Sequence, residues 1–442
     1  MARWFNDTDR RIFALAFPAL GALVAEPLYI LADTAVVGRL GTPELGGLAL
    51  ASSLLLIGYS AFIFLAYGTT STVARLLGAG QHERAAHQAV QSLWLALLIG
   101  IVVAAVTHVA RMPLISLLAG GDDANAEVVA NAEIYLRVSL LGVPAMLLGL
   151  AGVGYLRGLQ DTRRPLYVAV ATAVFNLVLE VVLIFGFGFG IGASALSTVI
   201  AQWLSAAAFM WWIRQAVSAH GVGLAPDWRI VGQLAGAGAD LLVRTTALRA
   251  GLMVTLAVAA RLGATELAAH EIAFQIWNFL ALALDAVAIA AQAMIGQALG
   301  AGDPGEARRL GDRIVRWGLI AGAVFAVVVL AVSPLLGSVF SNDDAVIALA
   351  GFVMLHVALW QPVNGVVFAL DGILIGAGDL RFLAISMAIA SAVLIGGAMA
   401  ALWLDAGIGW LWAALGAWMI TRAALLLRRY RGDAWLVVGA PG

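Results

Sequence analysis

The chain has 442 residues, of which 62% are hydrophobic and only 12% are charged. Soluble domains carry roughly 45–50% apolar and about 25% charged residues, so this composition excludes a water-soluble globular protein and makes lipid the solvent of much of its surface. The net charge of −1 argues against nucleic acid as a partner, and the absence of cysteine excludes disulfides, thiol catalysis and cysteine-bound metal.

The amino terminus predicts an uncleaved first span. Arg3, Arg10 and Arg11 precede an apolar stretch over 12–37. The apolar region of a signal peptide has roughly 7–15 residues, so this stretch is too long to be one. Basic residues flank spans on their cytoplasmic side, and we therefore expect the chain to start inside the cell.

Twelve stretches reach the length of about 20 apolar residues with which a helix crosses the hydrocarbon of a bilayer. They lie at 12–37, 48–74, 88–110, 132–156, 166–187, 191–214, 237–260, 268–298, 315–340, 346–375, 382–403 and 408–427. Strands of a membrane barrel alternate apolar and polar residues, and a stretch such as 95–106 does not. The sequence therefore predicts an all-α integral membrane protein with twelve transmembrane helices.

The arginines predict the orientation of these helices. Most of them lie in the termini and in the even-numbered loops, whereas the odd-numbered loops hold only Arg39, Arg111 and Arg261. Cytoplasmic loops are the ones enriched in basic residues. We expect both termini in the cytoplasm and the chain in the cytoplasmic (inner) membrane.

The two halves of the chain repeat each other. The motif Arg-Leu-Gly-x-x-Glu-Leu at 39–45 recurs at 261–267, and Leu-Gly-Ala-Gly at 77–80 recurs at 299–302. A further series recurs in the same order, with Pro144, Gly158, Asp161 and Arg163 matching Pro362, Gly376, Asp379 and Arg381. Each half holds six spans, so both halves enter the membrane from the same side. We predict two six-helix lobes related by a pseudo-two-fold axis along the membrane normal.

The repeat also predicts the domain boundaries. The amino-terminal lobe is expected over 1–214, a cytoplasmic interlobe linker over 215–236, and the carboxy-terminal lobe with a short cytoplasmic tail over 237–442. Two lobes around a membrane-spanning axis favour a central cavity that faces either side in turn, which indicates a transporter. A duplication without transport, as some membrane enzymes have, is the alternative.

The first span carries two carboxyl groups and two prolines. Glu26 and Asp33 are nearly two helical turns apart, so they share a face of the helix. Burial in the membrane disfavours the charged form of a carboxyl group, so such a pair is a candidate proton or cation site. Pro18 and Pro27 remove backbone hydrogen bonds and favour a helix kink. Glu26 has an alternative role as the ion-pair partner of a buried arginine.

Further polar residues lie in other spans. Asn176 and Glu180 share a face of the fifth span, and Thr198 and Gln202 share a face of the sixth. Glu180 is a third candidate for cation coupling, and the other three are candidates for lining a substrate cavity. Two more cavity candidates, in the second half, are Asp285 and Asp371. For both, pairing with a buried arginine is the structural alternative. His108, His270 and His356 occur singly and have no metal-site spacing, which favours a packing role.

These residues also resemble a known family. The stretch from Pro18 through Asp33 to Gly41 is similar to the first span of MATE (multidrug and toxic compound extrusion) transporters. The two Gly-Ala-Gly loops, at 78–80 and 300–302, and the stretch 176–199 fit that family as well. The stretch 247–301 most resembles the branch of DNA-damage-inducible protein F, and the resemblance covers nearly the whole chain.

The resemblance implies a two-lobe carrier that exports organic, often cationic, compounds against protons or sodium. In members with this pattern the aspartate matching Asp33 takes the coupling cation, and polar residues matching Asn176, Glu180 and Thr198 line the cavity. The fifth-span acid is commonly aspartate in the family and is glutamate here. The seventh span has no clear carboxyl group of the kind found in sodium-coupled relatives, and Arg249 occupies that neighbourhood. Both departures favour protons.

The function predicted from the sequence is therefore export of small organic compounds in exchange for protons, by a monomer in a lipid bilayer without a cofactor or metal. Sodium coupling is one alternative. Another is a flippase for lipid-linked saccharides, which would need several arginines in its cavity, whereas few arginines, among them Arg137, Arg244 and Arg249, lie well inside the predicted spans. An enzyme would need clustered catalytic groups. The only tight acidic pairs, 122–123 and 343–344, are expected to be solvated turns.

Overall fold

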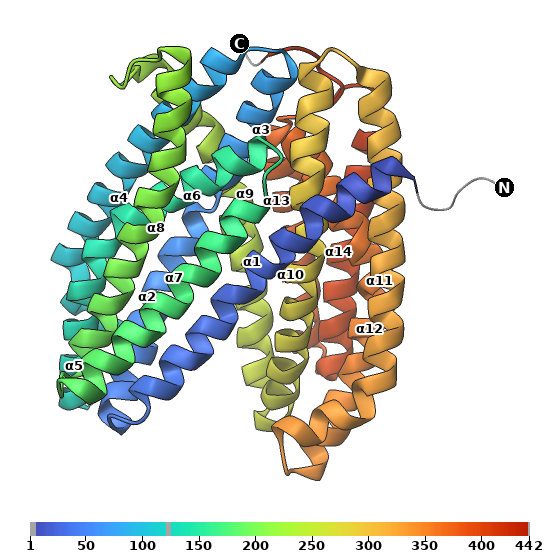
Figure 1. Ribbon diagram of the computed structural model, residues 1–442. Coiled ribbons are helices and arrows are strands. Elements are labelled where there is room, and N and C mark those ends of the chain that lie inside the picture. Colours follow the sequence, from blue (N-terminus) through green and yellow to red (C-terminus); the bar gives the residue numbers. More distant parts are fainter. Residues whose placement is uncertain (1–5, 121–124, 441–442) are drawn as a thin grey trace. The chain divides into compact units, whose positions relative to one another are not determined.

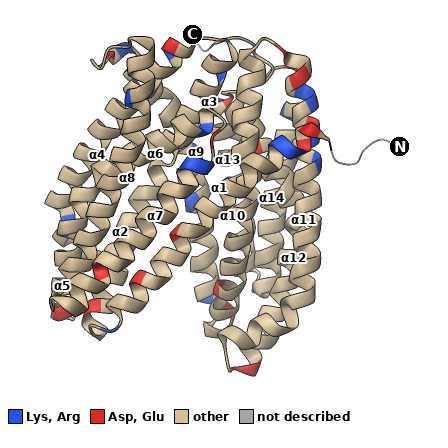
Figure 2. Cartoon of the chain, in the orientation of Figure 1, with Lys and Arg blue, Asp and Glu red and all other residues tan. Residues whose placement is uncertain are grey.

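The computed structural model describes residues 6–120 and 125–440, and regular structure in this part of the chain is helical. Within the described residues, twelve helical segments are long and apolar enough to cross a membrane. Each coincides with one predicted span, and only the span at 166–187 extends beyond its segment, by one residue, which confirms the all-α, twelve-span class. Most charged residues lie towards the ends of the helices (Figure 2), as the cost of charge in hydrocarbon requires. Asp122 and Asp123 lie outside the described residues.

The chain divides into two compact units, and Figure 1 colours their helices along the sequence. The first, called the amino-terminal unit, comprises Gly21–Gly238. It contains most of α1 (Asp7–Val37), then α2 (Thr42–Phe62), α3 (Phe64–Gly78), α4 (His82–Ala119), α5 (Ala126–Ser139), α6 (Val143–Gly158), α7 (Arg163–Val181), α8 (Ile191–His220) and the start of α9 (Trp228–Leu262).

The second, called the carboxy-terminal unit, comprises Met1–Leu20 and Ala239–Gly442. Its helices are the start of α1, the rest of α9, α10 (Ala264–Gly300), α11 (Pro304–Phe340), α12 (Asp344–Gly376), α13 (Leu380–Trp403) and α14 (Gly407–Arg431). It differs from the predicted lobe by including the first twenty residues, which the sequence assigned to the other lobe.

A buried ion pair explains why the start of α1 belongs to the carboxy-terminal unit. The Asp9 carboxylate has no exposed surface and accepts hydrogen bonds from Arg313 Nε at 2.5 Å and from Trp317 Nε1 at 2.7 Å, both on α11. It also accepts from the backbone N–H of Asn6, whose side chain accepts from the Asp9 N–H in return. This reciprocal capping box begins the helix, and the same carboxylate binds it to α11.

The internal repeat corresponds to the same helix contacts made once in each unit. In the amino-terminal unit α6 packs on α3 and α4, and in the carboxy-terminal unit α12 packs on α10 and α11. The repeated glycines make the close approach possible, because a Cβ atom at Gly154 would collide with the Ala66 carbonyl oxygen, and one at Gly372 with that of Ala288. Backbones approach this closely only where a side chain is absent, as membrane helix interfaces commonly require.

The two Gly-Ala-Gly loops are helix ends that need a left-handed residue. Gly80 has φ of 71° and Gly302 has φ of 77°, a conformation that other residues rarely adopt. In each loop the next N–H bonds back to the helix, from Gln81 to the Leu76 carbonyl and from Asp303 to the Ala298 carbonyl, each at the distance of a normal hydrogen bond.

Part of the predicted interlobe linker, 215–236, packs against the amino-terminal unit. The segment after α8 lies against α4, because Gln91 donates from Nε2 to the Ala225 carbonyl and accepts at Oε1 from the Asp227 N–H. The Trp94 indole donates to the Leu224 carbonyl at 2.8 Å. The chain consequently passes from one unit to the other inside α9, between Gly238 and Ala239.

Candidate functional site

Two buried carboxyl groups meet in the amino-terminal unit. Asp33 on α1 is 5% exposed, and Glu180 near the end of α7 has no exposed surface. The two lie close enough to interact directly. The hydroxyl of Ser194 on α8 donates to Asp33 Oδ1 at 2.9 Å. Among the described residues, no donor makes a hydrogen bond of normal length to either carboxylate oxygen of Glu180.

Neutral hydrogen-bonding groups surround the pair. The Tyr29 hydroxyl lies 2.8 Å from Thr198 Oγ1, and Asn176 Nδ2 donates to the same oxygen at 3.2 Å. The Tyr135 hydroxyl on α5 also lies close enough to interact with Ser194 and Thr198. We call these side chains, with Asp33 and Glu180, the acidic cluster. None of the surrounding groups carries a positive charge, so none of them offsets the charge of the carboxylates.

The chain geometry after Glu180 brings α7 and α8 side by side. The last turn of α7 widens into a π-helical segment, Val182–Gly186, and Gly188 follows with φ of 72°. Helix α8 then begins at Ile191, so Ser194 and Thr198, one turn apart, face Asn176 and Glu180 across the hairpin. Single π-helical turns are rare and are often found at functional sites.

This arrangement favours one proton on the pair of carboxyl groups. Two adjacent carboxylates repel each other, and burial without a positive partner adds the cost of desolvation. A proton on one of them removes the repulsion and supplies a donor between the two groups. The acidic cluster is thus able to bind and release a proton or another small cation, depending on access to water. Among the described residues no group of three or more His, Asp or Glu side chains has the geometry of a metal site.

The structure brings together Asp33, Asn176, Glu180 and Thr198, and it places the other candidates of the first half elsewhere. Glu26 is exposed and hydrogen-bonds to Tyr59 of α2, about 10 Å from Asp33 along the helix axis. Gln202 lies against Gly142, where a Cβ atom would collide with its Oε1. Helix α1 runs as one unbroken α-helix through Pro18 and Pro27.

The candidates of the second half lie in the carboxy-terminal unit, whereas the acidic cluster belongs to the amino-terminal unit. Asp371 is 5% exposed and accepts from Arg244 Nη2 at 2.8 Å and Arg422 Nη2 at 2.5 Å. Arg244 lies in the predicted span 237–260, and Arg422, which is buried in α14, lies in the predicted span 408–427. Asp285 on α10 is half-buried.

Sequence reasoning missed three members of the acidic cluster. Tyr29 lies one turn before Asp33, and Ser194 one turn before Thr198, so helical spacing from the recognised residues would have found both. Tyr135 has no such signal. Its helix is brought to α8 by packing, and no motif in the sequence relates the two segments.

The chain matches the MatE family model over residues 18–182 and 229–399. It is 32% identical to Protein DETOXIFICATION 44, chloroplastic, of Arabidopsis thaliana, with 86% of this chain and 74% of that protein aligned. It is 30% identical to DNA damage-inducible protein F of Escherichia coli strain K12, and there the alignment covers 98% of this chain and 95% of the relative.

Solved structures share the fold. One, a multidrug resistance MATE family transporter of the MOP superfamily in an outward-facing conformation, superposes with a TM-score of 0.86 over 96% of both chains, at 20% sequence identity. At this identity the likeness concerns the fold alone.

Proposed function

The chain belongs to the MatE family of membrane transporters, and from this premise we propose that it exports small organic compounds in exchange for protons. The observation that carries the proton-coupling part is the acidic cluster, in which two buried carboxyl groups adjoin each other without a cationic partner among the described residues. A relative whose name refers to detoxification supports an organic substrate.

Proton binding at Asp33 or Glu180 changes the charge buried between α1, α7 and α8. A change of charge shifts a conformational equilibrium only when the two states solvate that charge differently. In the proposed cycle, the deprotonated pair favours the state in which water reaches it, and the protonated pair favours the state in which it is sealed. Proton entry then resets the carrier for the next export step.

Sodium is the principal competing coupling ion. A sodium site needs several oxygen ligands around an ionised carboxylate. The acidic cluster offers the oxygens of Tyr29, Asn176 and Thr198, but Thr198 Oγ1 already takes part in hydrogen bonds with the other two. The adjacent pair of carboxyl groups is better suited to sharing a proton, and we therefore favour protons.

Transport in proteoliposomes tests the proposal. We expect a pH gradient, imposed without sodium, to drive accumulation of a cationic dye such as ethidium in vesicles that contain the purified protein. A sodium gradient at equal pH on both sides should drive none. Accumulation driven by sodium alone would contradict proton coupling, and dye exchange absent under both gradients would contradict export of this compound class. Movement of a lipid-linked saccharide instead would establish the flippase alternative.

The orientation of the chain is a separate proposal, with both termini, the turn at 79–81 and the start of α4 on the cytoplasmic side of the inner membrane. The arginine asymmetry supports it. The native chain has no cysteine, so a single cysteine placed at His82, which is exposed, gives a clean readout. In intact cells this cysteine should not react with an impermeant thiol reagent, whereas one placed at Ser341 should. Labelling of the first cysteine from outside would overturn the orientation.

A further inference from the structure

An open groove lies between α4 and α5 in the amino-terminal unit. Its volume is about 590 Å³, within the range of roughly 300–1,000 Å³ that is typical of ligand sites in proteins. Most of its lining is small or apolar, and the exceptions are Ser116 on α4 and Glu133 on α5. The groove therefore has room for a ligand that is mainly apolar and has a small polar part.

The groove lies where two predicted spans end. Arg111 directly follows the span 88–110, and Glu133 is the second residue of the span 132–156. Their side chains meet, because Arg111 Nε donates to Glu133 Oε1 at 2.9 Å. Close by on α4, Val109 is 83% exposed, as a side chain that faces lipid would be. Charged groups beside apolar side chains that face lipid indicate the level of the lipid headgroups.

Arg137 is an unusual residue next to this groove. It lies inside the predicted span 132–156, is exposed, and makes no hydrogen bond or ion pair with any described residue. A positive charge at the centre of a membrane span costs roughly 2.5–3.5 kcal/mol on insertion scales, and a bound anion would offset part of such a cost. The side chains of a helix lean toward its N-terminus, so Arg137 is directed back toward the turn that holds Glu133, about 6 Å away along the axis.

The polar atoms at this level match the headgroup of a phospholipid. The Arg137 guanidinium can hold a phosphate through charge-assisted hydrogen bonds. The second carboxylate oxygen of Glu133, Oε2, accepts no hydrogen bond from a described residue and is partly exposed. A carboxylate oxygen is an acceptor only, so it favours a headgroup that carries a hydrogen-bond donor. The charges of Arg111 and Glu133 cancel, which leaves the charge of Arg137 for the phosphate.

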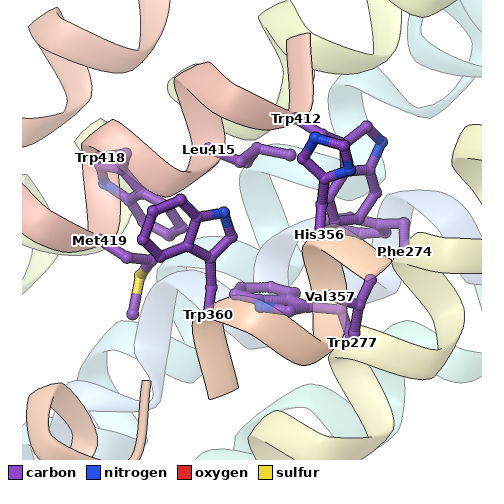
Figure 3. A pocket seen from close by; sticks show the side chains of 9 residues that line it. All are labelled: Phe274, Trp277, His356, Val357, Trp360, Trp412, Leu415, Trp418 and Met419. Carbon is purple, nitrogen blue, oxygen red and sulfur yellow. The ribbon is translucent and has the colours of Figure 1, made fainter. Parts of the chain in front are cut away.

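A pocket of the carboxy-terminal unit, walled by aromatic rings from α10, α12 and α14, offers no comparable room (Figure 3). Phe274 and Trp277 have ring centroids 5.7 Å apart, and the Trp360 indole occupies the space that a Cβ atom at Gly416 would need. The rings leave about 10 Å³, which is enough for about one water molecule. A lipid headgroup fits the groove between α4 and α5 and does not fit this pocket.

We propose that the groove between α4 and α5 binds one phospholipid whose headgroup carries a hydrogen-bond donor. Arg137 holds its phosphate, the donor bonds to Glu133 Oε2, and the acyl chains lie along the exposed apolar side chains of α4. Phosphatidylethanolamine has such a donor and phosphatidylcholine has none, although both are zwitterionic. The site uses no residue of the acidic cluster and goes beyond the proposed export function.

Native mass spectrometry of the purified, delipidated protein tests the proposal. Lipid adducts are counted at equal concentrations of lipids with the same acyl chains. We expect phosphatidylethanolamine to bind about three- to tenfold more tightly than phosphatidylcholine, as one net hydrogen bond allows. Diacylglycerol, which lacks the phosphate, should bind more weakly than either phospholipid.

Variants of Arg137 test the phosphate contact. Arg137→Gln removes the charge, so it should weaken the binding of both phospholipids about tenfold and leave that of diacylglycerol unchanged. Arg137→Lys keeps the charge and should keep most of the binding. Arg39→Gln makes the same change at an exposed position between α1 and α2, and this control should bind lipids as the native protein does.

A variant of Glu133 tests the headgroup contact. In Glu133→Gln the amide oxygen still accepts from Arg111, and an amide nitrogen replaces the second oxygen. The variant should lose the preference for phosphatidylethanolamine without weakening the binding of phosphatidylcholine. Glu127→Gln, at an exposed position of the same helix, should keep the preference and is the matched control.

Two results would overturn the proposal. One is equal binding of the two phospholipids to the native protein, and the other is native phospholipid binding in Arg137→Gln. Both Arg137 and Glu133 are at least partly exposed, so their variants should unfold close to the native temperature, which thermal unfolding in detergent checks. The outcome is separate from that of proton coupling, because Asp33→Asn should bind both phospholipids as the native protein does.

Discussion

Asp33→Asn is expected to reduce pH-driven dye accumulation to the level of protein-free vesicles. Asparagine has nearly the same size as aspartate and still accepts the hydrogen bond from Ser194, so the variant should fold and insert normally. It cannot ionise, however, and the acidic cluster would lose the group that exchanges a proton with water. Glu180→Gln should impair accumulation as well, because a single remaining carboxyl group lacks the neighbour that favours sharing a proton.

Asp7→Asn is the matched control for this experiment. It makes the same chemical change on the same helix, where the Asp7 side chain is 97% exposed, and it should transport at the native rate. Dye-for-dye exchange without a gradient, measured in parallel, distinguishes loss of coupling from loss of substrate binding. Native accumulation rates in Asp33→Asn would show that Asp33 is not the coupling residue, and the coupling proposal would then depend on Glu180.

Asp371→Ala should destabilise the carboxy-terminal unit strongly. The carboxylate accepts hydrogen bonds from two arginines, and Arg422 is only 4% exposed. Removing one partner of a buried ion pair leaves uncompensated charge and typically costs about 3–5 kcal/mol. We therefore expect a markedly lower thermal unfolding midpoint, measured by fluorescence-detected size exclusion in detergent.

Asp433→Ala provides the comparison, because it also breaks a pair with an arginine, Arg308, but its side chain is 91% exposed. Exposed pairs contribute about 1 kcal/mol or less, so this variant should unfold close to the native temperature. If Asp371→Ala unfolded at the native temperature but no longer transported dye, the carboxylate would serve the substrate, as the sequence suggested, and not the packing of α9, α12 and α14.

The fold class could be predicted from the sequence because only helices and closed barrels can span a lipid bilayer. A span needs about 20 apolar residues and must satisfy its own backbone hydrogen bonds, so hydropathy alone located each of the twelve helices in the described residues that could cross a membrane. The repeated glycines and prolines were equally visible, although their reason was not. At Gly158 and Gly376 a Cβ atom would collide with Val73 and with the Gln292 carbonyl oxygen, which only the packing of α6 on α3 and of α12 on α10 explains.

The acidic cluster was partly predictable. Asp33, Asn176, Glu180 and Thr198 were recognisable because polar residues in apolar helices are costly and therefore conspicuous. Their grouping was suggested by family resemblance and helical spacing, and the structure places them together. Glu26 shows what helical spacing cannot predict. It shares a helix face with Asp33, but the two residues lie at different depths and meet different neighbours.

By itself, then, the sequence determined that the chain lies in a membrane, where its helices are and that its two halves repeat. These properties depend on local composition and on motifs that can be compared along the chain. Tertiary structure alone decided which helices meet. It joined Asp9 to Arg313 and assigned the start of α1 to the carboxy-terminal unit, paired Asp371 with Arg422, and placed Tyr135 beside Ser194. It also gathered tryptophans from three helices around one pocket. Contacts between residues far apart in the chain depend on shape complementarity between whole helices, which no local pattern records.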